Sequence, residues 1–192
     1  MEKRRVVITG MGTVNPIGNS VAESWQAAKD GKCGIGPITR YDCSDMRVKL
    51  AGEVKDLDID GVLGKREAKK MDRFTQFALI AAQQAMDDSG LDREREDLSR
   101  CGVICSSGIG GFETVGGAFL RGESRGYDSV SPFMIPMIIS NMAAGQIAIR
   151  FGFQGMCTCV VTACAGGTIE KNYRKLFADA AGATMVIVGD VN

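Results

Sequence analysis

The chain has 192 residues, of which 45% are hydrophobic and 24% are charged, a composition typical of one globular domain with its own core. Its 23 basic residues balance its 23 acidic residues, so no electrostatic field attracts nucleic acid or an anionic membrane, and neither is an expected partner. No apolar run reaches the length of a transmembrane span or of a secretory signal, so we expect a cytoplasmic protein.

The chain opens with a predicted strand and a glycine-rich turn. The apolar run RVVITG predicts a strand over Arg5–Gly10, and GMGTVNPIG predicts a turn over Gly10–Gly18. A dinucleotide-binding fingerprint would need glycine in place of Asn15, and Pro16 stands where its helix should begin. We therefore favour a tight turn under the sheet, and a nucleotide-binding α/β domain stays open as an alternative.

A short helix and an irregular excursion follow. Ser20 and Glu23 have the spacing of a capping box, which predicts a helix over Val21–Lys29. Glycines and scattered charges predict an irregular surface segment over residues 31–62, with one short strand near Leu50–Val54.

The clearest helix is predicted over Asp72–Ser89. Its apolar residues recur at helical spacing: Phe74, Phe77, Ala78, Ala81, Ala82, Ala85 and Met86. Gly90 can supply the left-handed residue at its end. One face of this helix is therefore expected to pack on the core.

The second half of the chain alternates between predicted strands and helices. In chain order we expect a strand over Gly102–Ser106, the glycine-rich loop SSGIGG, a helix ending near Arg121, a polar loop over Gly122–Val130, a helix over Pro136–Phe151, a strand over Thr158–Thr162, a helix over Ala165–Ala180 and a strand over Thr184–Val188. Short apolar strands that alternate with helices predict an α/β fold, with layered helices around a mostly parallel central sheet.

Cys164 is the leading candidate for a catalytic residue. The surrounding segment Val160–Thr168, VVTACAGGT, indicates a strand, a tight turn and a helix that begins at the thiol. Unpaired N–H groups and the dipole at a helix N-terminus favour a negative sulfur, and the small neighbours leave room for a substrate. The competing interpretation is a buried small hydrophobe, which we expect for the other six cysteines: Cys33, Cys43, Cys101, Cys105, Cys157 and Cys159.

The chain contains no histidine, and its cysteines have no CxxC spacing. These absences remove the usual zinc arrangements, and no metal site is expected. General-base chemistry by histidine cannot be completed within these residues, so proton transfer must come from carboxylates, lysines, water or another polypeptide.

Five segments together resemble one family, the β-ketoacyl-acyl-carrier-protein synthases, and most closely the type II condensing enzymes of fatty-acid biosynthesis in the thiolase superfamily. The segments are GMGTVNPIG, KKMDRFTQFAL at Lys69–Leu79, SSGIGG at Ser106–Gly111, SPFMIPMIISNMAAGQIAIRFGFQG at Ser131–Gly155, and VVTACAGGT. They occur in the family's order and at consistent spacing, which makes the set more specific than any single motif.

The resemblance implies a thiolase-like fold and a two-step reaction. Residues 1–192 would form the N-terminal half of a β-ketoacyl synthase domain, with the C-terminal half absent. The nucleophilic cysteine would take an acyl group from the phosphopantetheine arm of acyl carrier protein. Malonyl-carrier protein would then lose carbon dioxide, and the carbanion would attack the acyl thioester. Because the arm delivers the substrates, the chain needs no cofactor of its own.

The resemblance also assigns roles to individual residues. Cys164 would be the nucleophile, and its backbone N–H would be one oxyanion-hole donor. Gly108, Ile109 and Ala163 would line the acyl pocket. Ile135 would reach the pocket of a dimer partner, since the family is usually dimeric.

Two departures from the family limit the expected activity. The family's second half carries two histidines and a lysine that support decarboxylation, and none of these is in this chain. The expected partners are therefore a second copy, in a homodimer, or a second chain that supplies the missing half. The helix after Gly167 also differs, because it presents a charged face that is expected to be wet: Glu170, Lys171, Arg174, Lys175 and Asp179. A catalytically inactive scaffold or dimerisation segment of the same fold therefore remains the alternative function.

Overall fold

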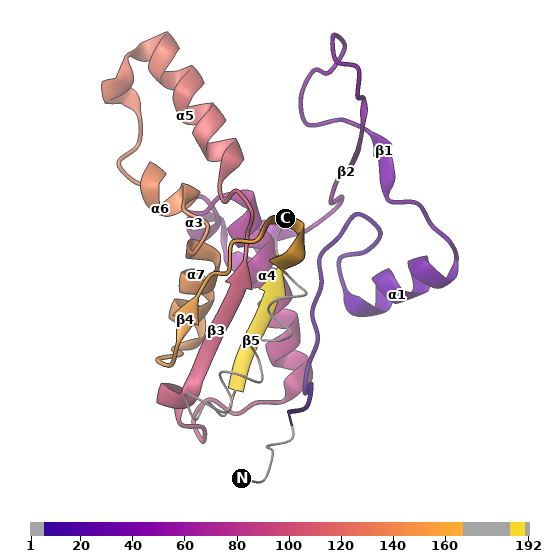
Figure 1. Ribbon diagram of the computed structural model, residues 1–192, viewed down its shortest axis with the longest axis vertical. Helices are drawn as coiled ribbons and strands as arrows, with labels where there is room; N and C mark the ends of the chain where they lie inside the picture. The colour runs from indigo at the N-terminus through magenta and orange to yellow at the C-terminus, as the bar shows by residue number, and fades with distance from the viewer. Residues whose placement is uncertain (1–5, 167–184, 191–192) are drawn as a thin grey trace.

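The structure is a computed structural model that describes residues 6–166 and 185–190. Its central sheet has three parallel strands in the order β4–β3–β5, with β4 at Cys157–Thr158, β3 at Cys101–Ser106 and β5 at Met185–Asp190 (Figure 1). Every residue of β3 is buried, as expected for the middle strand. The structure confirms the predicted parallel sheet.

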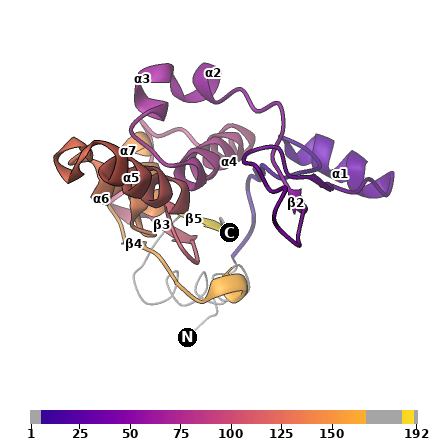
Figure 2. The same cartoon turned by 90° about the horizontal axis from the view of Figure 1, so that it is seen from above.

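Two helices cover one face of this sheet (Figure 2). They are α4, Arg73–Ser89, and α7, Met142–Phe151, and they contact each other and β3 or β5. The buried side chains between these elements form one core: Ala78, Leu79, Ala82, Met86, Val103, Ala143, Ala144, Ile147 and Phe151. The predicted helix over Asp72–Ser89 is confirmed, with Gly90 left-handed at its end at φ 64°.

The capping box of α1, Val21–Lys29, is confirmed with a shift of one residue. The Ser20 hydroxyl accepts a hydrogen bond from the Glu23 amide at 3.3 Å, as the pattern predicts. The Glu23 carboxylate accepts from the amide of Asn19 at 2.8 Å, one residue before the cap. Two N–H groups at this helix start are therefore satisfied by side chains.

The predicted strand over Arg5–Gly10 is wrong for residues 6–10, which have no strand partner, and residue 5 lies outside the described residues. The extended chain runs instead along α4. An added Cβ at Gly12 would lie 1.9 Å from the Ala81 carbonyl oxygen, so only a glycine permits this approach. The Met11 amide donates to the Asp88 carboxylate at 2.9 Å. The segment is thus bonded to helix side chains instead of a sheet.

The glycine-rich segment ends in a tight turn, as predicted. Asn15 and Gly18 exchange two backbone hydrogen bonds, of 3.0 and 3.2 Å. The turn lies beside α4, since the Gln84 side chain accepts from the Thr13 amide at 3.1 Å and donates to the Asn19 carbonyl at 2.7 Å. The turn was expected to lie under the sheet, but in the structure it lies beside α4.

Residues 31–62 contain more structure than the sequence predicts. β1, Ile35–Pro37, pairs antiparallel with β2, Leu50–Gly52, in a hairpin that projects from the rest of the molecule (Figure 1). The predicted strand near Leu50–Val54 is confirmed, but its partner strand was not expected. Two short helices follow, α2 at Ile59–Leu63 and α3 at Lys65–Ala68.

Two boundaries in the second half differ from the prediction. α5, Phe112–Arg125, continues past Arg121, so the loop expected from Gly122 begins later, with a 3-10 turn at Tyr127–Ser129. The Tyr127 ring folds back onto Gly122, where an added Cβ would meet it at 2.6 Å. The Tyr127 hydroxyl also donates to the Glu123 carboxylate at 2.6 Å. These contacts stabilise the last turn of the helix.

The single helix predicted over Pro136–Phe151 is two helices in the structure, α6 at Met134–Ile138 and α7. The carbonyl oxygen of Ile138 accepts a hydrogen bond from the Gly111 amide at 2.9 Å. Ile139 is extended, with ψ 133°, and ends α6. A tertiary contact thus takes the acceptor that a continuous helix would need. No helix among the described residues is long and apolar enough to cross a membrane.

Candidate active site

Cys164 lies in a 3-10 turn, η3, at Ala163–Ala165, and its side chain is exposed. Figures 1 and 2 place this turn near the end of the sheet where β3 and β5 finish, on the side away from α4 and α7. The carboxyl ends of parallel strands are where α/β proteins bind ligands. The helix predicted over Ala165–Ala180 falls, beyond Gly166, outside the described residues, and so does the charged face expected on it.

The strand that leads to Cys164 is shorter than predicted. β4 ends at Thr158 and pairs with β3 at only two positions, so the expected strand over Thr158–Thr162 is wrong beyond its first residue. Beyond β4, the Ser106 hydroxyl donates to the Val160 carbonyl at 2.6 Å. Ser106 is 0% exposed and is the last residue of β3. A side-chain hydrogen bond thus replaces the strand ladder in the segment that leads to Cys164.

The residues before the thiol have an unusual backbone. Ala163 has φ 47°, in the left-handed region that a residue with a Cβ enters at a cost of about 1–2 kcal/mol. The Ala165 amide donates to the Thr162 carbonyl at 3.1 Å and closes the turn. The Thr162 hydroxyl oxygen is buried and has no hydrogen-bond partner among the described residues. Strained backbone of this kind occurs often at functional sites and turns the chain sharply at Cys164.

A groove of about 400 Å³ lies beside the segment that precedes Cys164. Its lining is mostly apolar: Ile109, Val115, Ile138, Ile139, Ser140, Asn141, Cys159 and Val161. A volume of this size is in the range of small-molecule sites. Val161 is three residues from Cys164, so their Cα atoms are at most about 11 Å apart even in an extended chain.

Of the predicted pocket residues, the structure places only Ile109 in this groove. Gly108 is the chain neighbour of Ile109, and Ala163 is the chain neighbour of Cys164. Neither residue lines the groove. Ile135 lies on α6, 55% exposed. The assigned roles of these residues stay predictions.

The glycine-rich loop that carries Ile109 packs against the link between α6 and α7. Gly110 has φ 79°, and an added Cβ there would lie 2.1 Å from the Ile138 carbonyl oxygen. The Ser107 hydroxyl accepts from the Gly110 amide at 3.1 Å and closes the loop. Ile109 is thereby turned outward and is 73% exposed. The glycines thus permit close backbone packing against the α6–α7 link.

The groove residues outside the glycine-rich loop were missed by the sequence analysis. Val115, Ile138 and Ile139 are ordinary apolar residues of helix faces or ends, and nothing in the local pattern marks them as ligand contacts. Asn141 and Ser140 follow the break between the two helices, which was itself not predicted. These two residues could be assigned to the groove only once the end of α6 at Ile138 was known.

The other cysteines divide into three groups, of which one, Cys43 and Cys159, is half-buried. Cys101 and Cys105 are each 1% exposed, as expected, and burial, with a smaller contribution from Glu96 and Asp97, raises the pKa of the Cys101 thiol. Cys33 and Cys157 are exposed, so the prediction that they are buried is wrong. Cys157 lies on a two-residue strand at the sheet edge, which leaves its side chain uncovered.

Charged side chains do not gather into a metal site. Within residues 6–166 and 185–190, no group of three or more cysteine, aspartate or glutamate side chains is placed to hold a metal ion.

The family model and the curated relatives that match this chain belong to the same family. The model of the β-ketoacyl synthase N-terminal domain matches residues 3–189. A curated relative, 3-oxoacyl-[acyl-carrier-protein] synthase 2 of Synechocystis sp., is 46% identical over 168 residues. That match covers 88% of this chain and 40% of the relative, so the chain spans less than half the length of this curated protein.

Solved structures agree on the fold. The ishigamide ketosynthase/chain length factor superposes with a TM-score of 0.81 at 28% identity, covering 94% of this chain and 45% of that one. A type II polyketide ketosynthase in complex with its acyl carrier protein has a TM-score of 0.79 at 19% identity, covering 97% and 50%. The expected α/β, thiolase-like fold is confirmed. The chain therefore belongs to the β-ketoacyl synthase family and carries that family's N-terminal domain.

Proposed function

We propose that this chain provides the nucleophile of a β-ketoacyl-acyl-carrier-protein synthase of fatty-acid biosynthesis. The observation that carries the proposal is the exposed Cys164 thiol, which lies on a sharp backbone turn three residues after Val161, a residue that lines the apolar groove. An accessible thiol supplies the nucleophile, and a groove beside it can bind an aliphatic chain. The name of the curated relative supports the substrate class.

The first chemical step is a thioester exchange. The Cys164 sulfur attacks the carbonyl carbon of an acyl group on the phosphopantetheine arm of acyl carrier protein. A new carbon–sulfur bond forms, the bond to the arm breaks, and the proton lost by Cys164 passes to the departing thiol. The backbone N–H of Cys164 would stabilise the oxyanion of the intermediate. No electron is gained or lost, and no cofactor bound by the chain takes part.

The second step is the condensation. Malonyl-carrier protein loses carbon dioxide, and the carbanion attacks the acyl-cysteine thioester. The new carbon–carbon bond releases the β-ketoacyl product and the Cys164 thiolate, which regains a proton from water. Because these 192 residues contain no histidine, they supply none of the imidazole chemistry that assists such a decarboxylation. We therefore assign the acyl-accepting half-reaction to this chain and the condensation to an assembly that includes further residues.

The groove would bind the acyl chain. Ile109 forms part of its wall, and Gly108 and Ala163 lie at the ends of the segments that border it. Apolar lining favours a saturated chain over a polar or charged one, at about 0.8 kcal/mol for each buried methylene group. This role adds a function to Ile109 that explains why an isoleucine is 73% exposed.

A partner subunit is also part of the proposal. α5 and α6 expose several large apolar side chains: Phe112, Phe119, Leu120, Phe133 and Ile135. Exposed apolar surface of this extent favours association, and a homodimer would cover it and bring Ile135 to the neighbouring groove. The same surface supports the alternative function, a catalytically inactive scaffold or dimerisation segment. We place the protein in the cytoplasm, where acyl carrier proteins and reduced thiols occur together.

Mass spectrometry separates these functions. The chain is incubated with acyl carrier protein that carries an octanoyl group, and peptides are mapped. We expect one acyl adduct, on the peptide that contains Cys164, and its loss in Cys164→Ser. Cys33→Ser removes another exposed thiol and should leave the adduct unchanged. No acylation by a chain that still dimerises would favour the scaffold, and tight dinucleotide binding would favour a nucleotide-binding domain.

A further inference from the structure

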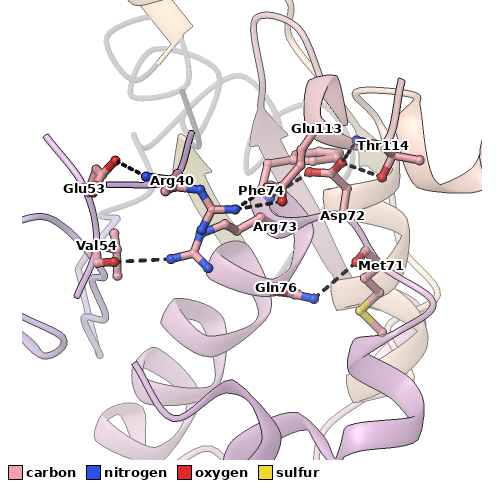
Figure 3. A network of polar contacts seen from close by, with 10 residues as sticks. All are labelled: Arg40, Glu53, Val54, Met71, Asp72, Arg73, Phe74, Gln76, Glu113 and Thr114. Carbon is pink, nitrogen blue, oxygen red and sulfur yellow. Dashed lines mark hydrogen bonds and ion pairs between the residues drawn. The ribbon is translucent and has the colours of Figure 1, made fainter. Parts of the chain in front are cut away.

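One buried carboxylate contacts the starts of two helices behind the groove. Asp72 is 6% exposed, and its Oδ2 atom accepts hydrogen bonds from the Thr114 amide at 2.8 Å and the Thr114 hydroxyl at 2.6 Å (Figure 3). Its Oδ1 atom faces the Phe74 amide in the first turn of α4 at 3.5 Å. Asp72 and Thr114 are 42 residues apart in the sequence, so this contact joins α4 to α5.

The nearby arginines have other partners, so the carboxylate depends on these donors. Arg40 binds Glu113 through two hydrogen bonds of 2.7 Å. Arg73 donates to the Val54 carbonyl at 3.2 Å (Figure 3). The Arg73 guanidinium also stacks over the Phe77 ring, with its carbon 4.8 Å from the ring centroid. Among the described residues no cation forms an ion pair with this carboxylate, so its hydrogen bonds and the positive ends of the helices must offset the loss of water. Removing Thr114 as a donor would therefore be costly.

The Asp72 contact lies directly behind one wall of the groove. Thr114 precedes Val115, which lines the groove, and α5 begins just after Ile109. An added Cβ at Gly111 would lie 3.0 Å from the Asp72 Oδ2 atom and 2.4 Å from the Met137 carbonyl oxygen. The first turn of α5 thus packs between Asp72 on one side and α6 on the other. A shift of this turn would move Ile109 and Val115 together.

The rest of α5 contributes little to holding that wall. Among the described residues, Gly122 is the only buried residue of the helix, and it packs on Tyr127 at the far end. Phe112, Phe119 and Leu120 are 71%, 58% and 69% exposed. A helix with so little buried apolar surface depends on the contacts at its first turn for its position.

We propose that Asp72 is a positioning residue that sets the length of aliphatic chain accepted by the groove. The proposal rests on the proposed function, because it takes the groove to be the site of the acyl chain. Asp72 does not touch that chain. It fixes the first turn of α5, which carries Val115 and directly follows the loop that carries Ile109, and both side chains line the groove.

The test uses small reagents that need only an accessible thiol. Cys164 is alkylated with N-methyl or N-octyl iodoacetamide, and the rate at its peptide is followed by mass spectrometry. In the native chain the octyl reagent should react faster, because its tail binds the groove. Asp72→Ala should lower the octyl-to-methyl rate ratio by about fivefold to tenfold and leave the methyl rate within about twofold. Faster hydrogen exchange at the Thr114 amide should accompany the change.

Asp97→Ala is the matched control. The Asp97 Oδ1 atom also accepts from the amide and the hydroxyl of one residue, Ser99, at 3.1 and 2.6 Å, but that contact is exposed and local. Its loss should leave the rate ratio unchanged. If Asp72→Ala does not fold, Thr114→Val keeps the backbone hydrogen bond and should lower the ratio by about twofold to threefold.

The outcomes decide the proposal. A folded Asp72→Ala chain with an unchanged ratio, or a native chain without any preference for the octyl reagent, overturns it. An octyl preference that depends on Asp72, in a chain that accepts no acyl group from carrier protein, would contradict the proposed function and keep the role of Asp72 in shaping the groove. The two failures are therefore distinguishable.

Discussion

Replacing Ser106 with alanine tests whether one side-chain hydrogen bond stabilises the segment before Cys164. The Ser106 hydroxyl donates to the Val160 carbonyl at 2.6 Å, across 54 residues of sequence. Beyond Thr158 the segment has no strand ladder. The substitution removes the donor and leaves the carbonyl without that partner.

The structure gives the expected size of the effect. Ser106 is 0% exposed, so no water can take the place of the hydroxyl at its own position. The acceptor lies in a partly buried segment, where water can reach part of the carbonyl. Losing such a bond costs about 1–2 kcal/mol, less than the cost at a fully buried acceptor. Ser129→Ala is the matched control, since the Ser129 hydroxyl donates to the Gly126 carbonyl at 2.7 Å in an exposed local turn, and its loss should cost at most about 0.5 kcal/mol.

Urea denaturation followed by circular dichroism measures the free energy of unfolding for both variants. Hydrogen exchange at the amides of residues 159–165 reports whether the segment has loosened. We expect a lower urea midpoint and faster exchange for Ser106→Ala, with little change for Ser129→Ala. Equal losses for the two variants, or unchanged exchange next to Cys164, would refute the reasoning that the buried hydroxyl orders this segment.

Three further predictions concern the backbone and two titrating groups. Gly110→Ala should lower the free energy of unfolding by about 2–4 kcal/mol, because φ is 79° and the new methyl group would meet the Ile138 carbonyl oxygen. The control Gly90→Ala, at φ 64° with open space around it, should lower it by about 1 kcal/mol. Equal losses for the two variants in thermal denaturation would contradict the predicted clash. Burial raises the pKa of the Cys101 thiol above its ordinary value of 9.0, so the stabilisation that the protonated thiol gives is present below pH 9 and lost as the pH rises through the folded pKa. The urea midpoint should therefore fall above pH 9 in the native chain, and fall less in Cys101→Ala. Hydrogen bonds from Thr39 lower the pKa of Glu53 below 4.5, so the contact is present above pH 4.5 and lost as the pH falls through the folded value. The protection of the Thr39 amide, measured as its exchange rate relative to that of an unstructured peptide at the same pH, should fall in acid, and in Glu53→Gln this protection should not change over the same pH range.

Helices with strong local signals could be predicted from the sequence almost to the residue. α1 begins after the capping pattern of Ser20 and Glu23, and α4 begins at its Asp72 cap and ends at Gly90. In each case the residues that stop the helix are its chain neighbours. The local sequence is then sufficient to predict where the helix begins or ends, because the capping hydrogen bonds and the left-handed residue lie within a few residues of that point.

Elements whose bounds depend on distant partners could not be predicted in the same way. Residues 6–10 have the composition of a strand but lie along α4, because Gly10 and Gly12 allow a close approach to its backbone. α6 ends where Gly111 takes the Ile138 carbonyl. β propensity and helix propensity are both weaker than such tertiary contacts, and the contacts are invisible until the fold is known.

The residues of the candidate site also differ in whether the local sequence could predict them. Cys164 could be identified from its own neighbours, since small residues after an apolar run mark a tight turn at a thiol. Ile109 could be placed by the glycines on both sides of it. Val115, Ile138 and Cys159 could not, because they reach the groove from three different elements whose relative positions no local pattern contains.

The contacts that position this site are polar although the groove is apolar, and the geometry explains why. Apolar packing is tolerant of small displacements, since one methyl contact can replace another at little cost. The hydrogen bonds of Ser106 with Val160 and of Asp72 with Thr114 are directional and lie where water cannot fully replace them. Each joins two segments that are far apart in the sequence, by 54 residues in the first case and 42 in the second. The thiol segment and the groove wall are thus each fixed by a bond that a small shift would break, and a reaction that brings a carbonyl carbon to within bonding reach of one sulfur atom needs positions fixed to that degree.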